Sequence, residues 1–207
     1  MKFDPFFPDF NAAQCKCDSF SPVQDITALP WDFKMRRDEV ALIMIDFQND
    51  FMKEGGFGSS LGNDVTRLTS IIPAAQAVLA AARDNGFKVI HTRETHKADL
   101  SDLNTSKYLR GIPGKRIGDH ADFGGRLLVA GEFGAEIIDE LKPLDDELVI
   151  DKPGKGAFWY TNLDQELKKA GITQLIFLGV TTEVCVQTTA REANDRGYEL
   201  VVVEDAT

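Results

Sequence analysis

The sequence predicts an α/β fold: a single domain built on a doubly wound, mostly parallel sheet with helices on both faces. Short apolar runs rich in β-branched residues alternate with longer stretches whose alanines and aliphatic residues recur at helical spacing. Such alternation is typical of parallel strands joined by helices. The 207 residues, of which 43% are hydrophobic, are enough for one substantial core.

Residues 1–38 are expected to form an aromatic-rich N-terminal arm, outside a domain that occupies residues 39–207. Aromatic residues lie among prolines and aspartates in this arm without a helical or an alternating period. They are Phe3, Phe6, Phe7, Phe10, Phe20, Trp31 and Phe33. Because aromatic residues are enriched in interface cores, we expect the arm to pack on its own domain or on a neighbouring subunit of a homo-oligomer, a tetramer or a dimer.

The first predicted strand spans residues 41–46 and is a continuous apolar run that stops at an acid, Asp46. A helix is expected over residues 70–85, where Pro73 falls in the first turn, which tolerates proline, and a glycine follows as a stop. The second predicted strand covers residues 87–93. A strand, a helix and a second strand in this order form the repeating unit of a parallel sheet.

Residues 94–132 are polar and dotted with glycine, and they are too long for an ordinary connection in a compact domain. We expect this segment to form a lid or an interface. Beyond it the same patterns predict a short helix over residues 135–141, a strand over residues 147–151 and a helix over residues 163–170.

The stretch from Gln174 to Cys185 predicts a buried strand that leads into a helix. An apolar run over residues 174–180 passes a glycine near its end, and polar helical sequence follows over residues 183–196. Cys185 would lie in the first helical turn, where free amides and the helix dipole favour a thiolate. A fifth strand over residues 200–205 nearly ends the sequence, so we expect that a C-terminal segment is missing or is supplied by a partner chain.

Three chemically distinctive residues follow three predicted strands: Asp46, Lys152 and Cys185. Because ligands bind at the carboxyl ends of parallel strands, these side chains should converge although they are far apart in sequence. A thiol, an acid and an ammonium together provide a nucleophile, a base that takes its proton and a cation that holds both charges. The alternatives are a buried structural cysteine and solvated charges at the strand ends.

These residues lie in motifs that resemble those of the isochorismatase-like cysteine hydrolases. Residues 41–51 resemble the motif that carries the family's general base. Lys152 followed by Gly156-Ala-Phe158 resembles the lysine motif, which usually has serine in place of the glycine. Residues 179–185 resemble the nucleophile motif, and the whole resemblance covers residues 37–207.

The resemblance implies a role for each matching residue. Asp46 would be the general base, Lys152 the catalytic cation and Cys185 the nucleophile. The amides of Thr181 and Cys185 would form the oxyanion hole, and the peptide bond from Val180 to Thr181 would be cis. The activity implied is hydrolysis through a covalent acyl-enzyme.

Within the family, residues 91–100, 151–156 and 191–198 resemble those of the biuret hydrolases. This implies cleavage of a C–N amide bond in a small urea-like or carbamoyl compound with release of ammonia, and favours biuret, converted to allophanate. Lys155 and Phe51 would then bind substrate. Amidohydrolases that act on ureidoacrylate or N-carbamoyl amino acids are the alternative, and a redox-sensing or other non-catalytic module with a reactive thiol is the alternative from another class.

No metal or other cofactor is expected. Relatives that bind a metal use an Asp-x-His pair and a distant histidine, whereas His91, His96 and His120 lack such spacing. Cys15 and Cys17 form a Cys-x-Cys pair with no nearby partner. The formal charge of -10 argues against nucleic acid as a partner. No apolar run is long enough for a membrane span and no signal-peptide pattern is present, so we expect a cytoplasmic protein that binds a small-molecule substrate.

Overall fold

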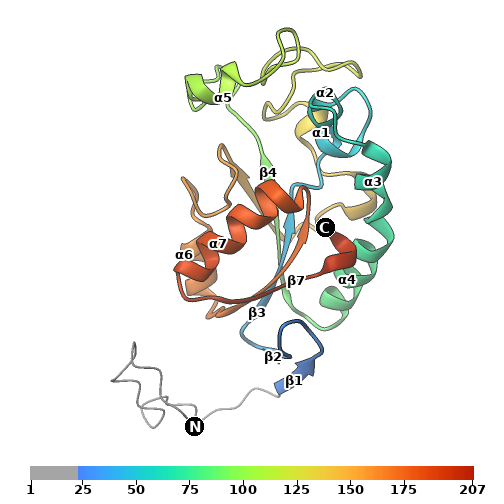
Figure 1. Cartoon of the computed structure of the whole chain (residues 1–207). Helices are drawn as coiled ribbons and strands as arrows, with labels where there is room; N and C mark the ends of the chain where they lie inside the picture. The colour runs from blue at the N-terminus through green and yellow to red at the C-terminus, as the bar shows by residue number, and fades with distance from the viewer. Residues whose placement is uncertain (1–22) are drawn as a thin grey trace.

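The computed structural model describes residues 23–207, and its centre is a five-stranded parallel sheet in the order β5-β4-β3-β6-β7 (Figure 1). The strands are β3 (Val40–Ile45), β4 (Lys88–Glu94), β5 (Leu148–Lys152), β6 (Gln174–Gly179) and β7 (Glu199–Val202). Every neighbouring pair in this sheet is parallel. The predicted fold class is confirmed, and each predicted strand is present, although the last is shorter than expected.

The middle of the sheet is β3, which pairs with β4 on one side and with β6 on the other. All six residues of β3 are buried, which accounts for its uninterrupted apolar sequence. Leu42 and Met44 belong to the apolar cluster on one face, and Ala41, Ile43 and Ile45 belong to the cluster on the other. The chain therefore builds outward from β3 in both directions, which makes this strand the topological switch point of the sheet.

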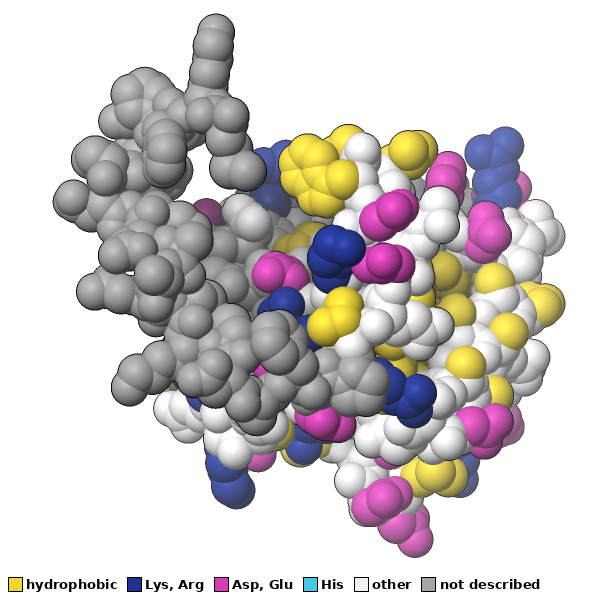
Figure 2. Space-filling model, turned by 90° about the horizontal axis from the view of Figure 1, so that it is seen from below, with side chains coloured by type: hydrophobic (Ala, Val, Ile, Leu, Met, Phe, Trp, Pro, Cys, Tyr) yellow, Lys and Arg dark blue, Asp and Glu magenta, His cyan; other side chains and the backbone are white. Residues whose placement is uncertain are grey.

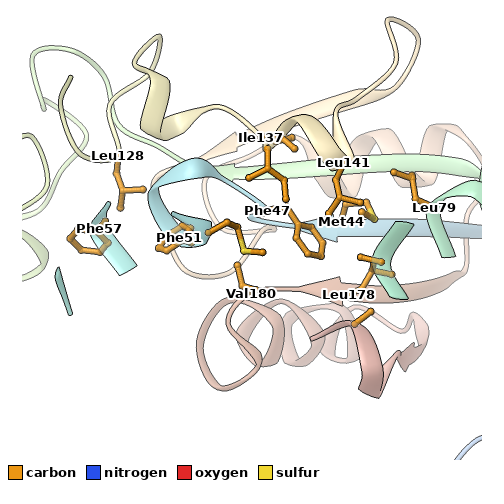
Figure 3. Packing of buried hydrophobic residues seen from close by; sticks show 14 of the residues in the cluster. Met44, Phe47, Phe51, Phe57, Leu79, Leu128, Ile137, Leu141, Leu178 and Val180 are labelled. Carbon is orange, nitrogen blue, oxygen red and sulfur yellow. The ribbon is translucent and has the colours of Figure 1, made fainter. Parts of the chain in front are cut away.

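Helices cover both faces of the sheet (Figure 1). On one face α3 (Val65–Ser70) leads into α4 (Ile72–Asp84), which packs in the same cluster as Met44 (Figure 3). On the other face α6 (Leu163–Lys169) and α7 (Gln187–Asp195) pack in the second cluster. This is the doubly wound arrangement that the sequence predicts.

The stretch Val65–Asp84, which comprises α3 and α4, is long and apolar enough to cross a membrane by length and composition alone. In the fold Ala75, Leu79 and Ala82 are buried against the sheet, whereas the exposed residues of α4 are small or polar: Pro73, Gln76, Ala77, Ala80, Ala81 and Asp84. This one-sided burial is typical of a helix in the outer layer of an α/β domain.

The prediction of a helix over residues 135–141 is wrong. Two 3₁₀ turns, Phe133–Ala135 and Asp139–Leu141, lie there instead. The backbone between them bonds to the loop after β3, and the amide of Ile138 donates to the carbonyl oxygen of Phe47 at 2.9 Å. Backbone groups that are satisfied in this way are not available for helical hydrogen bonds.

Short elements and loops lie at the carboxyl ends of the strands (Figure 1). α1 (Asn49–Met52) and α2 (Phe57–Ser60) follow β3, and α5 (Thr105–Leu109) lies in the long segment predicted over residues 94–132. This segment is at the edge of the sheet where a lid would have to be, and its function as a lid or an interface stays a prediction. A final 3₁₀ turn, Glu204–Ala206, follows β7.

Residues 23–36 form an antiparallel hairpin of β1 (Val23–Ile26) and β2 (Phe33–Arg36), which the sequence analysis does not predict. Its strands of four residues are too short to show a clear alternation. Phe33 and Met35 are buried in a small apolar cluster below the sheet. This part of the expected arm therefore packs on its own domain.

Residues 1–22 lie outside the described part of the chain, and so do Cys15 and Cys17. The expectations for them stay predictions. On the face seen from below, hydrophobic side chains are interspersed with acidic and basic ones (Figure 2).

Candidate active site

Three strand ends bring Asp46, Lys152 and Cys185 together, as the strand order predicts. The ammonium Nζ of Lys152 lies 2.8 Å from Oδ2 of Asp46, and both side chains are fully buried. Ligand atoms of Asp46, Glu94 and Cys185 all lie within 4.8 Å of one another. The site is at the carboxyl ends of β3, β4, β5 and β6, where open α/β sheets bind ligands.

The close approach of β6 to β3 depends on Gly179. A Cβ atom at this position would lie 2.1 Å from the carbonyl oxygen of Ile45, and the backbone of Gly179 has a φ of 136°. Only glycine combines this conformation with the available space. The glycine thereby lets the nucleophile motif start directly beside Asp46.

Asp46 is the first residue after β3 and has a φ of 53°. Its Oδ1 accepts a hydrogen bond from Oγ1 of Thr92 at 2.6 Å, which fixes the carboxylate against β4. Its Oδ2 has the ionic contact to Lys152 and no hydrogen bond from any other described residue. One oxygen is therefore anchored, and the other is available to accept a proton.

Lys152 ends β5, and acceptors surround its ammonium. Nζ donates to the carbonyl oxygens of Gly154 at 3.1 Å and Lys155 at 3.0 Å, in addition to its contact with Asp46. Burial by itself lowers the pKa of Lys152, but the nearby carboxylates of Asp46 and Glu94, together with Cys185 when it is a thiolate, outweigh burial, and the net pKa is raised. The lysine is therefore a permanent cation.

Cys185 lies in a π-helical turn, Thr182–Val186, that precedes α7. The thiol is buried, and Sγ donates to Oε2 of Glu94 at 3.4 Å. Burial raises the pKa of Cys185 well above its usual value, Asp46 and Glu94 raise it further, and Lys152 opposes them. The expectation of an easily ionised cysteine at a helix start is therefore wrong for the free protein, because desolvation and two carboxylates outweigh the helix end.

Thr181 lies between β6 and the cysteine turn. The peptide bond from Val180 to Thr181 is cis, as the resemblance implies. The carbonyl oxygen of Thr181 accepts from the amide of Val186 at 3.2 Å, which closes the turn around Cys185. The oxyanion-hole function of the Thr181 and Cys185 amides stays a prediction.

Glu94 is a site residue that the sequence analysis missed. It ends β4, is fully buried and contacts three ammoniums: Lys107 at 2.7 Å, Lys155 at 3.0 Å and Lys152 at 3.9 Å. Burial by itself raises the pKa of Glu94, but these cations outweigh burial and lower the pKa to about 2. Its position at a strand end, which drew attention to Asp46, is the signal that could have identified it.

Lys107 is the second missed residue, and it comes from α5 in the long segment. Besides Glu94, its ammonium contacts Nε2 of His96 at 2.9 Å and the carbonyl oxygen of Pro153. Nδ1 of His96 in turn lies 3.3 Å from Asp102. No motif surrounds Lys107, so only the folded arrangement could reveal it.

The two expected substrate-binding residues have different surroundings. Nζ of Lys155 lies 3.0 Å and 3.2 Å from the two carboxylate oxygens of Glu94, and 37% of this side chain is exposed. Phe51 is buried in the larger apolar cluster, edge-on to Phe57 (Figure 3). Lys155 is thus at the site, while the ring of Phe51 packs in the core beside it, and both assignments to substrate binding stay predictions.

Comparison with known proteins agrees with the fold and with these motifs. The family model described as the isochorismatase domain matches residues 40–207. The chain belongs to the isochorismatase family. This match includes the whole sheet and all three strand-end residues predicted to be catalytic.

Individual members of the isochorismatase family also resemble the chain. Ureidoacrylate amidohydrolase RutB of Cronobacter sakazakii is 31% identical over 193 residues, which cover 88% of this chain and 80% of the relative. A cysteine hydrolase from Pseudomonas syringae superposes with a TM-score of 0.71 at 27% identity, covering 84% of this chain and 74% of that one. N-carbamoylsarcosine amidase from Thermoplasma acidophilum superposes with a TM-score of 0.64 at 27% identity, covering 82% and 83%.

These isochorismatase-family relatives favour the alternative substrates of the sequence analysis over biuret. The amidohydrolase from Cronobacter is named for ureidoacrylate, and the amidase from Thermoplasma is named for N-carbamoylsarcosine. Both compounds contain a carbamoyl group bonded to nitrogen. The assignment to the isochorismatase-like family is confirmed, whereas the narrower assignment to biuret hydrolase is not shown.

Two histidines of this isochorismatase-family chain, His91 and His96, have side-chain partners close in the fold. His91 is buried in β4, with Nε2 2.9 Å from Glu147. The acidic and thiol groups that cluster within 4.8 Å of one another are Asp46, Glu94 and Cys185. The Lys152 ammonium contacts the carboxylates of both Asp46 and Glu94. Lysine therefore supplies the positive charge that balances these two acids.

Proposed function

We propose that the chain is a cysteine amidohydrolase that cleaves a C–N bond of small carbamoyl or ureido compounds. The observation that supports this proposal most directly is the buried ion pair of Asp46 and Lys152 beside a protonated Cys185 thiol. A neutral thiol needs a base within reach before it can attack a carbonyl. Asp46 can be that base, because it lies in one cluster with the thiol and its Oδ2 has no described partner other than Lys152.

In the first half of the reaction Asp46 accepts the proton of Cys185, and Sγ attacks the carbonyl carbon of the substrate. The π electrons of the carbonyl move onto oxygen, and the amides of Thr181 and Cys185 stabilise the oxyanion. The oxyanion then collapses, the C–N bond breaks, and the protonated Asp46 gives its proton to the leaving nitrogen. Sulfur and the carbonyl carbon stay joined as a thioester or thiocarbamate.

In the second half Asp46 takes a proton from water, and the hydroxide attacks the carbonyl carbon bound to Cys185. Collapse of this second intermediate breaks the C–S bond, and the proton returns to sulfur. Lys152 stays charged throughout because the surrounding negative groups raise its pKa. Its role is to keep the carboxylate in place and to offset the charge of the thiolate.

The charges around the site favour a carbamoyl compound that carries a carboxylate over neutral biuret. Lys107, Lys152 and Lys155 supply three positive charges, and Asp46 and Glu94 supply two negative charges. With a neutral thiol, this cluster has one positive charge in excess. A singly anionic substrate balances that excess, whereas biuret leaves it uncompensated.

The reactive-thiol alternative is weaker. Redox-sensing cysteines are solvent-accessible and have a low pKa. Cys185 is only 4% exposed, and burial raises its pKa. These properties suit a nucleophile that a neighbouring base activates.

A substrate panel tests the proposal. Purified protein is incubated with ureidoacrylate, N-carbamoylglycine, N-carbamoylsarcosine, biuret and nicotinamide, and ammonia is measured. Ammonia would be the leaving group or would come from breakdown of a carbamate product. We expect carboxylate-bearing carbamoyl compounds to be turned over faster than biuret, and Cys185→Ser to abolish release from all of them. Equal release by wild type and Cys185→Ser would contradict the proposed function.

A further inference from the structure

Glu94 contacts the nucleophile directly, yet no step of the proposed reaction uses it. The two oxygens of its buried carboxylate have different partners. Oε1 lies 2.7 Å from the ammonium of Lys107 and 3.0 Å from that of Lys155. Oε2 lies 3.4 Å from the thiol of Cys185 and 3.2 Å from Lys155. Both oxygens thus contact Lys155, and only Oε2 also faces the reacting sulfur.

The surroundings of Glu94 suit a fixed hydrogen-bond acceptor better than a proton carrier. Three ammoniums approach its carboxylate, whereas Lys152 is the one ammonium in contact with Asp46 among the described ion pairs. The pKa of Glu94 is lowered to about 2, so this group does not hold a proton near neutral pH. A buried anion that cannot take a proton still accepts N–H donors strongly.

We propose that Glu94 accepts a hydrogen bond from the N–H group that stays on the carbonyl carbon when Cys185 attacks, and that it thereby selects ureido compounds over carboxamides. This inference rests on the proposed amidohydrolase function. When the thiol proton moves to Asp46, Oε2 of Glu94 loses the hydrogen bond that it accepts from Sγ of Cys185. The substrate nitrogen beside the new C–S bond can then replace the thiol as donor.

Asp46 and Glu94 would each interact with one of the two nitrogen substituents of a ureido carbonyl. Asp46 must lie beside the leaving nitrogen because it delivers a proton there. Glu94 lies on the neighbouring strand and also contacts the sulfur, so it is available to the retained nitrogen. A simple carboxamide has carbon at that second position and cannot replace the hydrogen bond that Oε2 of Glu94 loses with the thiol proton. Glu94 then keeps only its contacts with the lysine ammoniums, and the missing hydrogen bond to this buried anion discriminates against such a substrate.

Lys107 and Lys155 would act as positioning residues for this acceptor. The ammonium of Lys107 has three acceptors, namely Glu94, His96 and the carbonyl oxygen of Pro153, so its direction is fixed. Glu94 receives this ammonium from the long segment and the Lys155 ammonium from the loop after β5. Two separate parts of the chain therefore hold the carboxylate against Cys185.

The test compares N-carbamoylglycine with succinamate. In succinamate a methylene group replaces the internal N–H, which is the retained group when ammonia is the leaving group, and the rest of the molecule is unchanged. Ammonia release gives kcat/KM for both compounds with wild type and Glu94→Gln. We expect Glu94→Gln to lower kcat/KM for N-carbamoylglycine at least tenfold and that for succinamate less than threefold. In Glu94→Gln the neighbouring ammoniums orient the amide oxygen of glutamine toward themselves. Its NH₂ group then faces the N–H group of the substrate, and because both groups are donors, no hydrogen bond forms between them.

A matched control is Glu147→Gln. Glu147 is also a largely buried acid in ion pairs, with Arg83 and His91, but it lies away from the carboxyl ends of the strands. We expect this variant to lower thermal stability while the ratio of the two kcat/KM values stays as in wild type. A change in that ratio as large as the one in Glu94→Gln would overturn the inference.

Alkylation of Cys185 by iodoacetamide provides a second measurement that a purely structural role would not alter. The charged groups that face the thiol are Lys152, Asp46, Glu94 and Lys155. Because the carboxylate of Glu94 raises the pKa of the thiol, its neutralisation should shift the rise of the alkylation rate to lower pH. A pH profile identical to that of wild type would contradict direct contact between Glu94 and the thiol.

The outcomes separate this inference from the proposed function. If wild type releases no ammonia from any carbamoyl compound, the proposed function fails and the inference fails with it. If wild type is active but Glu94→Gln lowers both kcat/KM values equally, only the inference is overturned. If Glu94→Gln fails to fold, the Michaelis constants of wild type provide the test. A KM for N-carbamoylglycine that is not below the KM for succinamate would overturn the inference.

Discussion

Nζ of Lys152 lies 2.8 Å from Oδ2 of Asp46, and neither side chain is exposed to solvent. Two residues more than a hundred positions apart thus form one buried ion pair at the carboxyl ends of β3 and β5. Removal of one partner from a buried pair leaves the other charge uncompensated, which is costly to stability. The same pair serves the proposed chemistry, so stability and activity are linked at this point.

Lys152→Ala should abolish turnover and destabilise the fold by about 3 to 5 kcal/mol, because it leaves Asp46 buried and unpaired. Urea unfolding and ammonia release measure the two effects. The control is Lys168→Ala, which removes an exposed ion pair with Asp164 on α6 and should cost less than about 1 kcal/mol. Near-wild-type kcat in Lys152→Ala would show that the assigned role is wrong.

Cys185→Ala and Asp46→Asn should each abolish turnover while the fold survives. Asp46→Asn should also lower stability, because it leaves the buried ammonium of Lys152 without its charged partner. Both substitutions are small, and asparagine keeps an oxygen for the hydrogen bond from Thr92. The double variant should be no slower than either single variant, because groups that act as one unit do not contribute independently. Additive losses in kcat would indicate that the two residues act in separate steps.

Acid stability should depend on Glu94, whose pKa is lowered from 4.5 to about 2 in the fold. Because the folded pKa is below the unfolded one, the stabilisation is present above about pH 4.5 and is lost as the pH falls toward 2. The shift corresponds to stabilisation on the order of 3 kcal/mol. Urea unfolding at pH 6 and pH 3 should therefore show a smaller pH dependence in Glu94→Gln than in wild type.

Lys155→Met should lower kcat/KM for the preferred carbamoyl substrate at least tenfold, because one of the ammoniums that hold Glu94 is lost. The same loss is expected for biuret if that compound is turned over. Cys185 should remain open to alkylation, which shows that the site is still formed. Lys168→Met serves as the control for the loss of a surface charge, and an unchanged kcat/KM in Lys155→Met would remove this residue from substrate binding.

The protein should form a homo-oligomer, as the aromatic-rich N-terminal region suggests. Within the described residues, Leu29 is 95% exposed and Trp31 is 77% exposed in the turn of the hairpin. Light scattering at micromolar concentration should report a dimer or a larger assembly, and Trp31→Ser should shift it toward monomer. Trp159→Ser, at another exposed aromatic residue, is the control. A wild-type monomer would contradict this prediction.

The sequence alone predicted the parallel sheet and the convergence of Asp46, Lys152 and Cys185. Both follow from local patterns combined with one topological rule, because apolar runs mark buried strands and parallel strands end at the same edge. The same patterns were wrong over residues 135–141. There the backbone bonds to the loop after β3, and side-chain periodicity carries no information on such a contact.

Only the tertiary structure determined the electrostatics of the site. The protonated state of Cys185 depends on its burial and on the carboxylates of Asp46 and Glu94, none of which the position of a cysteine at a helix start reveals. The contact of Lys107 with Glu94 joins α5 to the end of β4, and no spacing rule predicts it. A strand end can be recognised from a few neighbouring residues, whereas the charge state of a buried group depends on every element packed around it.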